Sequence, residues 1–204
     1  MPQHVIQRGN NRQMCFQDPA DRGAYLAFLS KYRKEHEVDI HAWVLMDNHT
    51  HLLVTPRKDD SLSRFMKALG QRYAQYFNFK YERTGTLWEG RFKSCLVDTE
   101  SYFLQCQRYI ELNPVKAGMV DNPEDYRWSS YLYHAYGLRA KWHTPHDCYL
   151  NYQPDPDLRQ ASYRSFVASS PPPGTDDLIF YTAISGKALG TETFREEMNT
   201  RYGV

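Results

Sequence analysis

Two predicted strands joined at Asp47-Asn48 restrict the fold of this chain more than any other feature. Residues 38–46 and 49–55 are rich in apolar and β-branched side chains and flank a turn dipeptide, so they predict an antiparallel hairpin. Successive side chains of a strand point to opposite faces, which places His49 and His51 on the same face. Two neighbouring imidazoles on a rigid strand are half of a metal site. The alternative is a pair of hydrogen-bonded surface or core histidines.

A second constraint is a predicted helix that ends near Pro114. Proline disfavours the α conformation in the residue before it, so Asn113 is expected at or near the C-terminal end of this helix. Tyr109 precedes Asn113 by four residues, which places both on one helix face. A phenol with an oxygen ligand one turn away is the arrangement that a metal-assisted tyrosine nucleophile needs. The alternative is that Tyr109 belongs to an apolar core stripe with Tyr102 and Cys106.

The other elements predict an α+β fold. Asp18 is expected to cap the first helix, with Pro19 at its first position. Strand, helix, strand, strand, helix, strand and helix follow one another over residues 4–8, 19–36, 38–46, 49–55, 61–77, 87–94 and 102–113. This order predicts a ferredoxin-like antiparallel sheet with helices packed against it.

Alternation within two of these strands predicts which side chains share a face. Ile40, Ala42 and Val44 are expected together on one face of the strand before the hairpin turn. In the strand over residues 87–94, Trp88 and Phe92 are expected on one face, with Arg91 and Lys93 on the other. Trp88 suits the core, and the alternative is a stacking platform for nucleobases.

The amino-acid composition changes after Pro114, which predicts that the chain is divided into a domain and an extension. We expect one domain over residues 1–120 and a mostly helical C-terminal extension over residues 121–204. A Pro-rich, semi-rigid linker is expected near residues 169–175. Two short helices, over residues 176–185 and 191–201, are interpreted as a packing appendage, and the alternative is a helix-turn-helix.

Charge is uneven along the 204 residues. The formal net charge is +1, which gives no global argument for nucleic-acid binding. From Arg57 to Lys93, however, the sequence contains nine basic and four acidic residues, which gives this stretch a net charge of +5. Such a block holds phosphates or, alternatively, forms a solvated helix face.

The sequence lacks the features of secreted and membrane proteins. The four cysteines are scattered without a Cys-x-x-Cys pair, which favours reduced thiols over a zinc site. No apolar run is long enough for a membrane span, and the first residues lack a signal-peptide pattern. We therefore expect a soluble protein of the cytoplasm that is not associated with a membrane.

The pair of histidines on a central strand, followed by a helix with Tyr109 and Asn113, resembles the HUH single-tyrosine transposases. Five segments narrow the resemblance to the REP-associated tyrosine transposases. In order they span residues 4–12, 46–53, 88–92, 108–118 and 126–131. Each segment alone is weak, but five in the same order are specific. The resemblance covers residues 3–135 well and the remainder loosely.

This resemblance implies the HUH endonuclease fold and a metal-dependent endonuclease and strand transferase for single-stranded DNA. Its substrates would be REP-type hairpins, cut through a 5′-phosphotyrosine intermediate. Carried over to this chain, Tyr109 is the nucleophile. The metal ligands are His49, His51 and Asn113, and the ion is Mg²⁺ or Mn²⁺. A nitrogen-rich set of ligands favours Mn²⁺.

Candidate DNA contacts lie in three places. The first is the loop after the first strand, where side-chain donors are expected to read base edges. The alternative for this loop is a turn stabilised by its own side chains. The second place is the strand over residues 87–94, and the third follows the tyrosine helix; both are expected to contact phosphates. The residues are Arg8, Asn10, Asn11, Arg12, Arg91, Lys93 and Lys116.

Two other functions stay open at this point. One is a metal-dependent hydrolase in which water attacks and Tyr109 is structural. The other is a non-catalytic protein that binds DNA hairpins. The short connection after the tyrosine helix and the long C-terminal segment favour a monomer acting in cis over a dimer.

Overall fold

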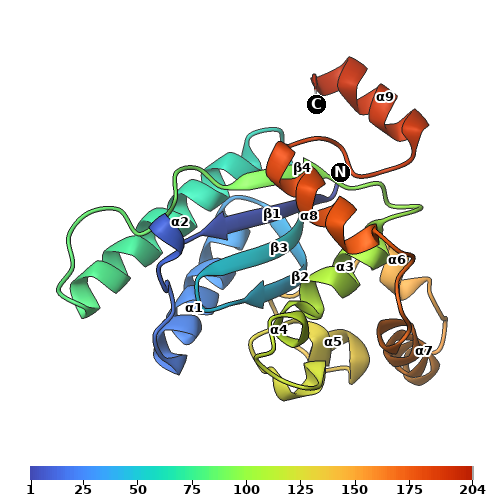
Figure 1. The fold of residues 1–204 in the computed structure, drawn as a ribbon, viewed down its shortest axis with the longest axis horizontal. Coiled ribbons are helices and arrows are strands. Elements are labelled where there is room, and N and C mark those ends of the chain that lie inside the picture. Colours follow the sequence, from blue (N-terminus) through green and yellow to red (C-terminus); the bar gives the residue numbers. More distant parts are fainter. Residues whose placement is uncertain (204) are drawn as a thin grey trace.

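The computed structural model describes residues 1–203 and contains a four-stranded antiparallel sheet with helices on both faces (Figure 1). The strands lie in the order β2-β3-β1-β4. They are β1 (Gln3–Arg8), β2 (Val38–Leu45), β3 (His49–Pro56) and β4 (Lys93–Leu96). Helices α1 (Pro19–Glu35) and α2 (Ser61–Lys80) cover one face, and α3 (Phe103–Glu111) covers the other. The predicted fold class and ferredoxin-like order of elements are confirmed.

Local sequence signals place the first helix as predicted. The Asp18 carboxylate accepts a hydrogen bond from the main-chain nitrogen of Asp21 at 3.0 Å. The Asp21 carboxylate accepts one from the nitrogen of Asp18 in return, at 3.2 Å. This reciprocal cap, with Pro19 in the first turn, satisfies donors that the helix cannot pair internally.

The predicted face of Ile40 is wrong. A β-bulge in β2 interrupts the register with β3 between Ile40 and Ala42. An extra residue in a strand reverses the alternation beyond it. Ile40 therefore packs on the α1 and α2 side with Trp43, whereas Ala42 and Val44 pack on the α3 side.

The predicted strand over residues 87–94 is also largely wrong, because β4 begins only at Lys93. The preceding segment crosses the end of β1, where Glu89 donates its main-chain nitrogen to the carbonyl of Arg8 at 2.8 Å. Gly90 then takes a positive φ of 67°, a conformation that strands do not use. Trp88 is thereby turned toward α2, where its indole nitrogen donates to the Gly70 carbonyl at 2.9 Å.

The rest of the chain forms helices and 3₁₀ turns. A 3₁₀ turn η1 (Asn10–Arg12) follows β1, and α4 (Asn113–Lys116) follows α3. The C-terminal elements are η2 (Pro123–Asp125), α5 (Tyr131–Ala135), α6 (Asp147–Leu150), α7 (Pro156–Ala168), α8 (Thr175–Ser185) and α9 (Glu192–Tyr202). Helix α8 lies against β4 and α3 (Figure 1). Across residues 1–203, no helix has both the length and the apolar character needed to cross a membrane.

One buried carboxylate joins α3 to the C-terminal elements. Glu111, at the end of α3, is fully buried and accepts three hydrogen bonds. Ser130 and His134 donate to one carboxylate oxygen at 2.6 and 2.7 Å. Tyr163 of α7 donates to the other oxygen at 2.6 Å. Residues far apart in the chain are thus held to the helix that carries Tyr109.

Candidate active site

The sheet brings a third histidine to the predicted pair. In the register of β1 and β3, Ile6 lies opposite His51 and His4 lies opposite Leu53. His4 therefore shares the face of His51, and its Nε2 lies 2.8 Å from His51 Nδ1. The analysis of the sequence did not include His4 in the site. The sequence did predict that His4 lies in a strand. It could not predict that His4 aligns with His51, because the register of two strands depends on residues far apart in the chain.

His49 and His51 lie side by side, as alternation predicts, with ring centroids 5.0 Å apart. His49 Nδ1 donates to the side-chain oxygen of Asn48 at 2.6 Å. Each ring thus uses its Nδ1 in a hydrogen bond, and within residues 1–203 no hydrogen bond occupies the Nε2 of either ring. Partners of this kind fix the tautomer and orientation of histidines that bind metals.

Burial keeps these three imidazoles neutral. It lowers the pKa of His4 to about 3. Burial and then the charge of Arg8 lower the pKa of His49 to about 4. Burial, followed by the neighbouring His49 and His4, holds the pKa of His51 well below its ordinary value. A neutral imidazole is the form that binds a metal ion, so the electrostatics suit the donor set.

Tyr109 of α3 lies directly over the histidines. Its ring packs edge to face on His51 and His4, with centroids 5.8 and 5.9 Å away. Burial raises the pKa of its phenol above the ordinary value, because the charged form would lose hydration. The Lys116 ammonium lies 4.5 Å from the ring centroid and is also 2.7 Å from a carboxylate oxygen of Asp176 in α8. The ion pair of Lys116 and Asp176 therefore lies against the phenol ring.

Asn113 begins α4, directly after the end of α3, close to where the proline signal placed it. Its side-chain nitrogen donates to the carbonyl of Tyr109 at 2.8 Å, which leaves its amide oxygen as the atom that can coordinate. No group of three or more His, Cys, Asp or Glu side chains in the described chain is arranged to hold a metal. Asn113 is not one of these residue types, and an amide oxygen is a ligand that hard divalent ions accept.

Four of the predicted DNA contacts lie at the end of β1 or directly after it. Arg8 lies opposite His49 in the sheet. Asn10, Asn11 and Arg12 form the exposed turn η1, which main-chain bonds hold: Gly9 donates to Asn48 and Asn10 donates to Leu87, both at 2.8 Å. The turn thus relies on its main chain, and these polar side chains are left to the solvent.

The remaining predicted contacts lie at the sheet edge and beside the tyrosine. Arg91 and Lys93 are exposed at the start of the edge strand β4. Lys116 lies beside Tyr109, as described above. The structure thus brings Tyr109, His49 and His51 together, with Arg8 and Lys116 close by, and places Arg91 and Lys93 at the edge of the sheet.

Comparisons with known proteins agree on one family. The family model described as "Transposase IS200 like" matches residues 1–113. A REP-associated tyrosine transposase of Escherichia coli (strain K12) is 26% identical over 104 residues, which are 50% of this chain and 60% of that protein. This chain therefore matches less than two thirds of the length of that relative.

Two solved structures are also similar. A REP-associated tyrosine transposase bound to a REP hairpin has a TM-score of 0.54 and 20% identity, and the match covers 71% of this chain and 85% of that one. A putative transposase from Deinococcus radiodurans R1 has a TM-score of 0.41 and 23% identity, covering 54% and 88%. The first of these similarities shows a common fold.

Proposed function

Because this chain belongs to the IS200-like transposase family, we propose that it cuts and rejoins single-stranded DNA with Tyr109 as the nucleophile. The observation that carries the proposal is the position of Tyr109, whose ring packs on His51 and His4 of the central strands. A similar protein is described as REP-associated and a similar structure as bound to a REP hairpin, so REP-type hairpins are the proposed substrate.

We propose that His49, His51 and Asn113 hold Mg²⁺ or Mn²⁺ and that two imidazoles favour Mn²⁺. When bound, the ion supplies positive charge that polarises the scissile phosphate. For His51 to coordinate through Nε2, its Nδ1 must carry the proton and donate to His4. His4 Nε2 then accepts, and its proton lies on Nδ1, which is buried without a partner among the described residues. His4 is therefore a positioning residue for His51.

The reaction follows from the position of the phenol. The Tyr109 oxygen attacks the phosphorus, its proton leaves to solvent, and the bond from phosphorus to the 3′ oxygen breaks. That oxygen takes a proton, so the products are a 5′-phosphotyrosine and a free 3′-hydroxyl. Attack by a 3′-hydroxyl on the phosphotyrosine reverses these steps and rejoins DNA. Burial raises the pKa of Tyr109 and the positive charge of Arg8 acts in the opposite direction, so Arg8 assists as the phenol loses its proton. Lys116 holds the ring through its ammonium group.

DNA is proposed to approach from the β1 end of the site. Asn10, Asn11 and Arg12, which η1 presents to solvent, would contact base edges and phosphates there together with Arg8, the last residue of β1. Arg91 and Lys93 would hold phosphates at the sheet edge.

The organisation of the protein is part of the same proposal. Residues 1–120 form the catalytic domain, and residues 121–204 form an extension that supports α3. Tyr109 meets the histidines of its own chain, which supports a monomer acting in cis. The proposed location is the bacterial cytoplasm, at the nucleoid.

A denaturing gel tests the function. The protein is incubated with Mn²⁺ and a single-stranded hairpin from the flanks of its own gene, labelled at either the 5′ or the 3′ end. We expect the 3′-labelled fragment to migrate with the protein and the 5′-labelled fragment to run free. Neither fragment should form when EDTA is present. A protein-linked 5′ label would contradict the proposed polarity. Cleavage unaffected by EDTA would contradict the metal.

His4→Leu tests the role of the third histidine. This substitution removes the acceptor for His51 Nδ1 while keeping an apolar side chain in a fully buried position. We expect Mn²⁺ affinity to fall about 10- to 100-fold, the usual effect of losing a partner that orients a ligand. Isothermal titration with Mn²⁺ measures it, and His4→Gln, which restores an acceptor, should recover part of the affinity. Unchanged affinity in His4→Leu would refute the positioning role.

A further inference from the structure

We propose that a pocket on the sheet face opposite Tyr109 binds one unpaired nucleobase of the DNA strand, with Gln7 reading its edge. The pocket, called here the base pocket, lies between α2 and residues 88–93 and has a volume of about 560 Å³. Volumes of this size suit a small ligand such as a nucleotide. The inference rests on the proposed function, because it assigns a second contact to the same DNA.

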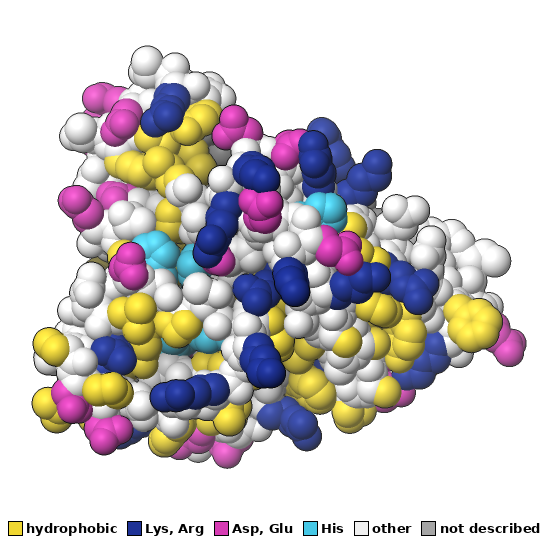
Figure 2. Space-filling model, turned by 180° about the vertical axis from the view of Figure 1, so that it is seen from behind, with side chains coloured by type: hydrophobic (Ala, Val, Ile, Leu, Met, Phe, Trp, Pro, Cys, Tyr) yellow, Lys and Arg dark blue, Asp and Glu magenta, His cyan; other side chains and the backbone are white. Residues whose placement is uncertain are grey.

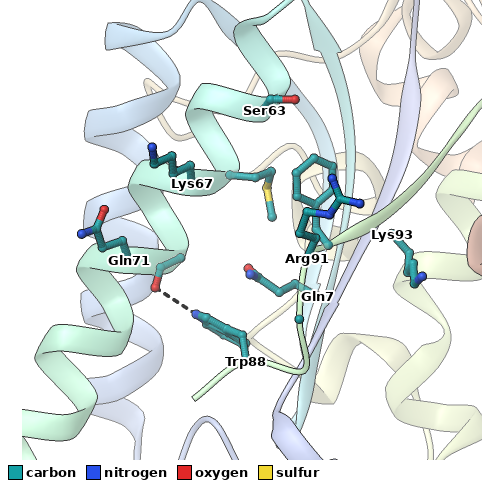
Figure 3. A pocket seen from close by; sticks show the side chains of 11 residues that line it. Gln7, Ser63, Lys67, Gln71, Trp88, Arg91 and Lys93 are labelled. Carbon is teal, nitrogen blue, oxygen red and sulfur yellow. Dashed lines mark hydrogen bonds between the residues drawn. The ribbon is translucent and has the colours of Figure 1, made fainter. Parts of the chain in front are cut away.

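Gln7 is the polar centre of the base pocket. Its neighbour Ile6 packs toward α3, so Gln7 points toward α2 by strand alternation (Figure 3). The Gln7 side chain is only 7% exposed, and its Oε1 is buried without a hydrogen-bond partner among residues 1–203. A buried acceptor without a donor is costly. Rotation of the amide would present this oxygen to a ligand N–H group in the pocket, and the new hydrogen bond would remove that cost.

The walls suit a flat ring. Trp88 is held by its bond to the carbonyl of Gly70, and Met66 and Phe92 line the same hollow. Apolar walls around one amide match the shape of a base, which has apolar faces and a hydrogen-bonding edge. Space beside Gly70 is limited, since a Cβ there would come within 3.1 Å of the Gln7 amide nitrogen.

The charge around the base pocket suits phosphate. In the basic block of residues 57–93, Arg57, Lys58, Arg64 and Lys80 form ion pairs with carboxylates. Lys67, Arg91 and Lys93 have no carboxylate partner in the described part of the chain, and all three border the pocket, although Lys67 and Lys93 extend their side chains away from Gln7 (Figure 3). No lining residue is acidic. Arg72, which packs over Phe28, and Arg83, which donates to Gln13, also lack a carboxylate partner among the described residues but do not line the pocket. Three of the five unpaired cations of the block therefore border the place proposed for a nucleotide.

A route joins the base pocket to the catalytic face. Arg91 and Lys93 also line a second hollow with Ile6 and Arg8, on the α8 side of the sheet. Arg8 in turn lies opposite His49 in the sheet. Figure 2 shows that Lys and Arg side chains gather across the middle and right of the face seen from behind Figure 1. A strand leaving Tyr109 can thus follow basic residues around the β4 edge into the pocket.

The amide also selects a base. A glutamine side chain pairs with adenine by accepting from its exocyclic amine and donating to a ring nitrogen. A carboxylate in its place accepts from the exocyclic amine of cytosine. Adenine is therefore the base proposed for the pocket, and Gln7→Glu should move the preference to cytosine.

Binding, not cleavage, tests this proposal. The Tyr109→Phe protein is titrated by fluorescence anisotropy with the gene-flanking hairpin and its single-stranded overhangs, in which each nucleotide in turn is made abasic. We expect one position to lose affinity about tenfold, the effect of one base contact. In Gln7→Met the intact DNA should bind about tenfold more weakly, with no further loss at that position. Gln7→Glu should bind cytosine there better than adenine.

Controls separate this contact from a change in folding. Gln75→Met replaces an exposed glutamine of α2, the helix beside the pocket, that does not line the pocket, and this variant should bind DNA as the parent does. Gly70→Ala leaves Gln7 in place but crowds its amide, and it should also remove the dependence on that base. No position-dependent loss in the scan, or a loss that persists unchanged in Gln7→Met and Gly70→Ala, would overturn the proposal. If the wild-type protein did not cleave DNA but the abasic scan gave the expected result, the proposed nuclease function would be overturned and the base pocket would stand.

Discussion

Tyr109→Phe is expected to abolish the protein–DNA adduct and to reduce cleavage by about a thousandfold or more, because no other group can form the phosphotyrosine. Phenylalanine keeps the ring that packs on His4 and His51 and lies beside the Lys116 ammonium. The fold and the binding of DNA should therefore be retained. Single-turnover cleavage of labelled hairpin DNA measures the rate, and anisotropy measures binding.

The matched control is Tyr136→Phe, which removes an exposed phenol outside the site and should cleave at the wild-type rate. Cleavage that survives Tyr109→Phe would favour a hydrolase in which water attacks and Tyr109 is structural. Absence of cleavage in the wild-type protein, together with tight binding, would favour a hairpin-binding protein without catalysis.

Glu111→Ala is expected to lower the free energy of unfolding by about 3–5 kcal/mol, the range seen when one partner of a buried charged network is removed. The substitution leaves three buried donors, on Ser130, His134 and Tyr163, without their acceptor. It also leaves a cavity between α3 and the C-terminal elements. In a chain of this size the loss corresponds to a fall in Tm of roughly 10 °C.

Thermal and urea unfolding monitored by circular dichroism measure this change. Glu124→Ala, at an exposed position, should change the free energy of unfolding by less than about 0.5 kcal/mol. Tyr163→Phe removes one of the three donors and should cost less than Glu111→Ala. A loss below about 1 kcal/mol in Glu111→Ala would mean that the network does not hold the extension to α3.

Sequence by itself determined the features that depend on neighbours along the chain. The cap of α1 follows from Asp18 and Pro19, and the hairpin follows from Asp47-Asn48 between two strands. Strand alternation is enough to place His49 and His51 on one face. Tyr109 and the nearby Asn113 follow from helix periodicity and the proline signal, since these rules act within a few residues.

Only the tertiary structure decided the features that depend on pairing between distant segments. His4 enters the site because β1 and β3 align in one particular register, across 47 residues of sequence. The bulge that turns Ile40 to the other face, and the late start of β4 after Gly90, depend on which segments lie beside them. Gln7 becomes a buried acceptor only because α2 and Trp88 close over it. A sequence carries no local signal for such arrangements, because register and packing minimise the energy of the whole sheet rather than of one strand.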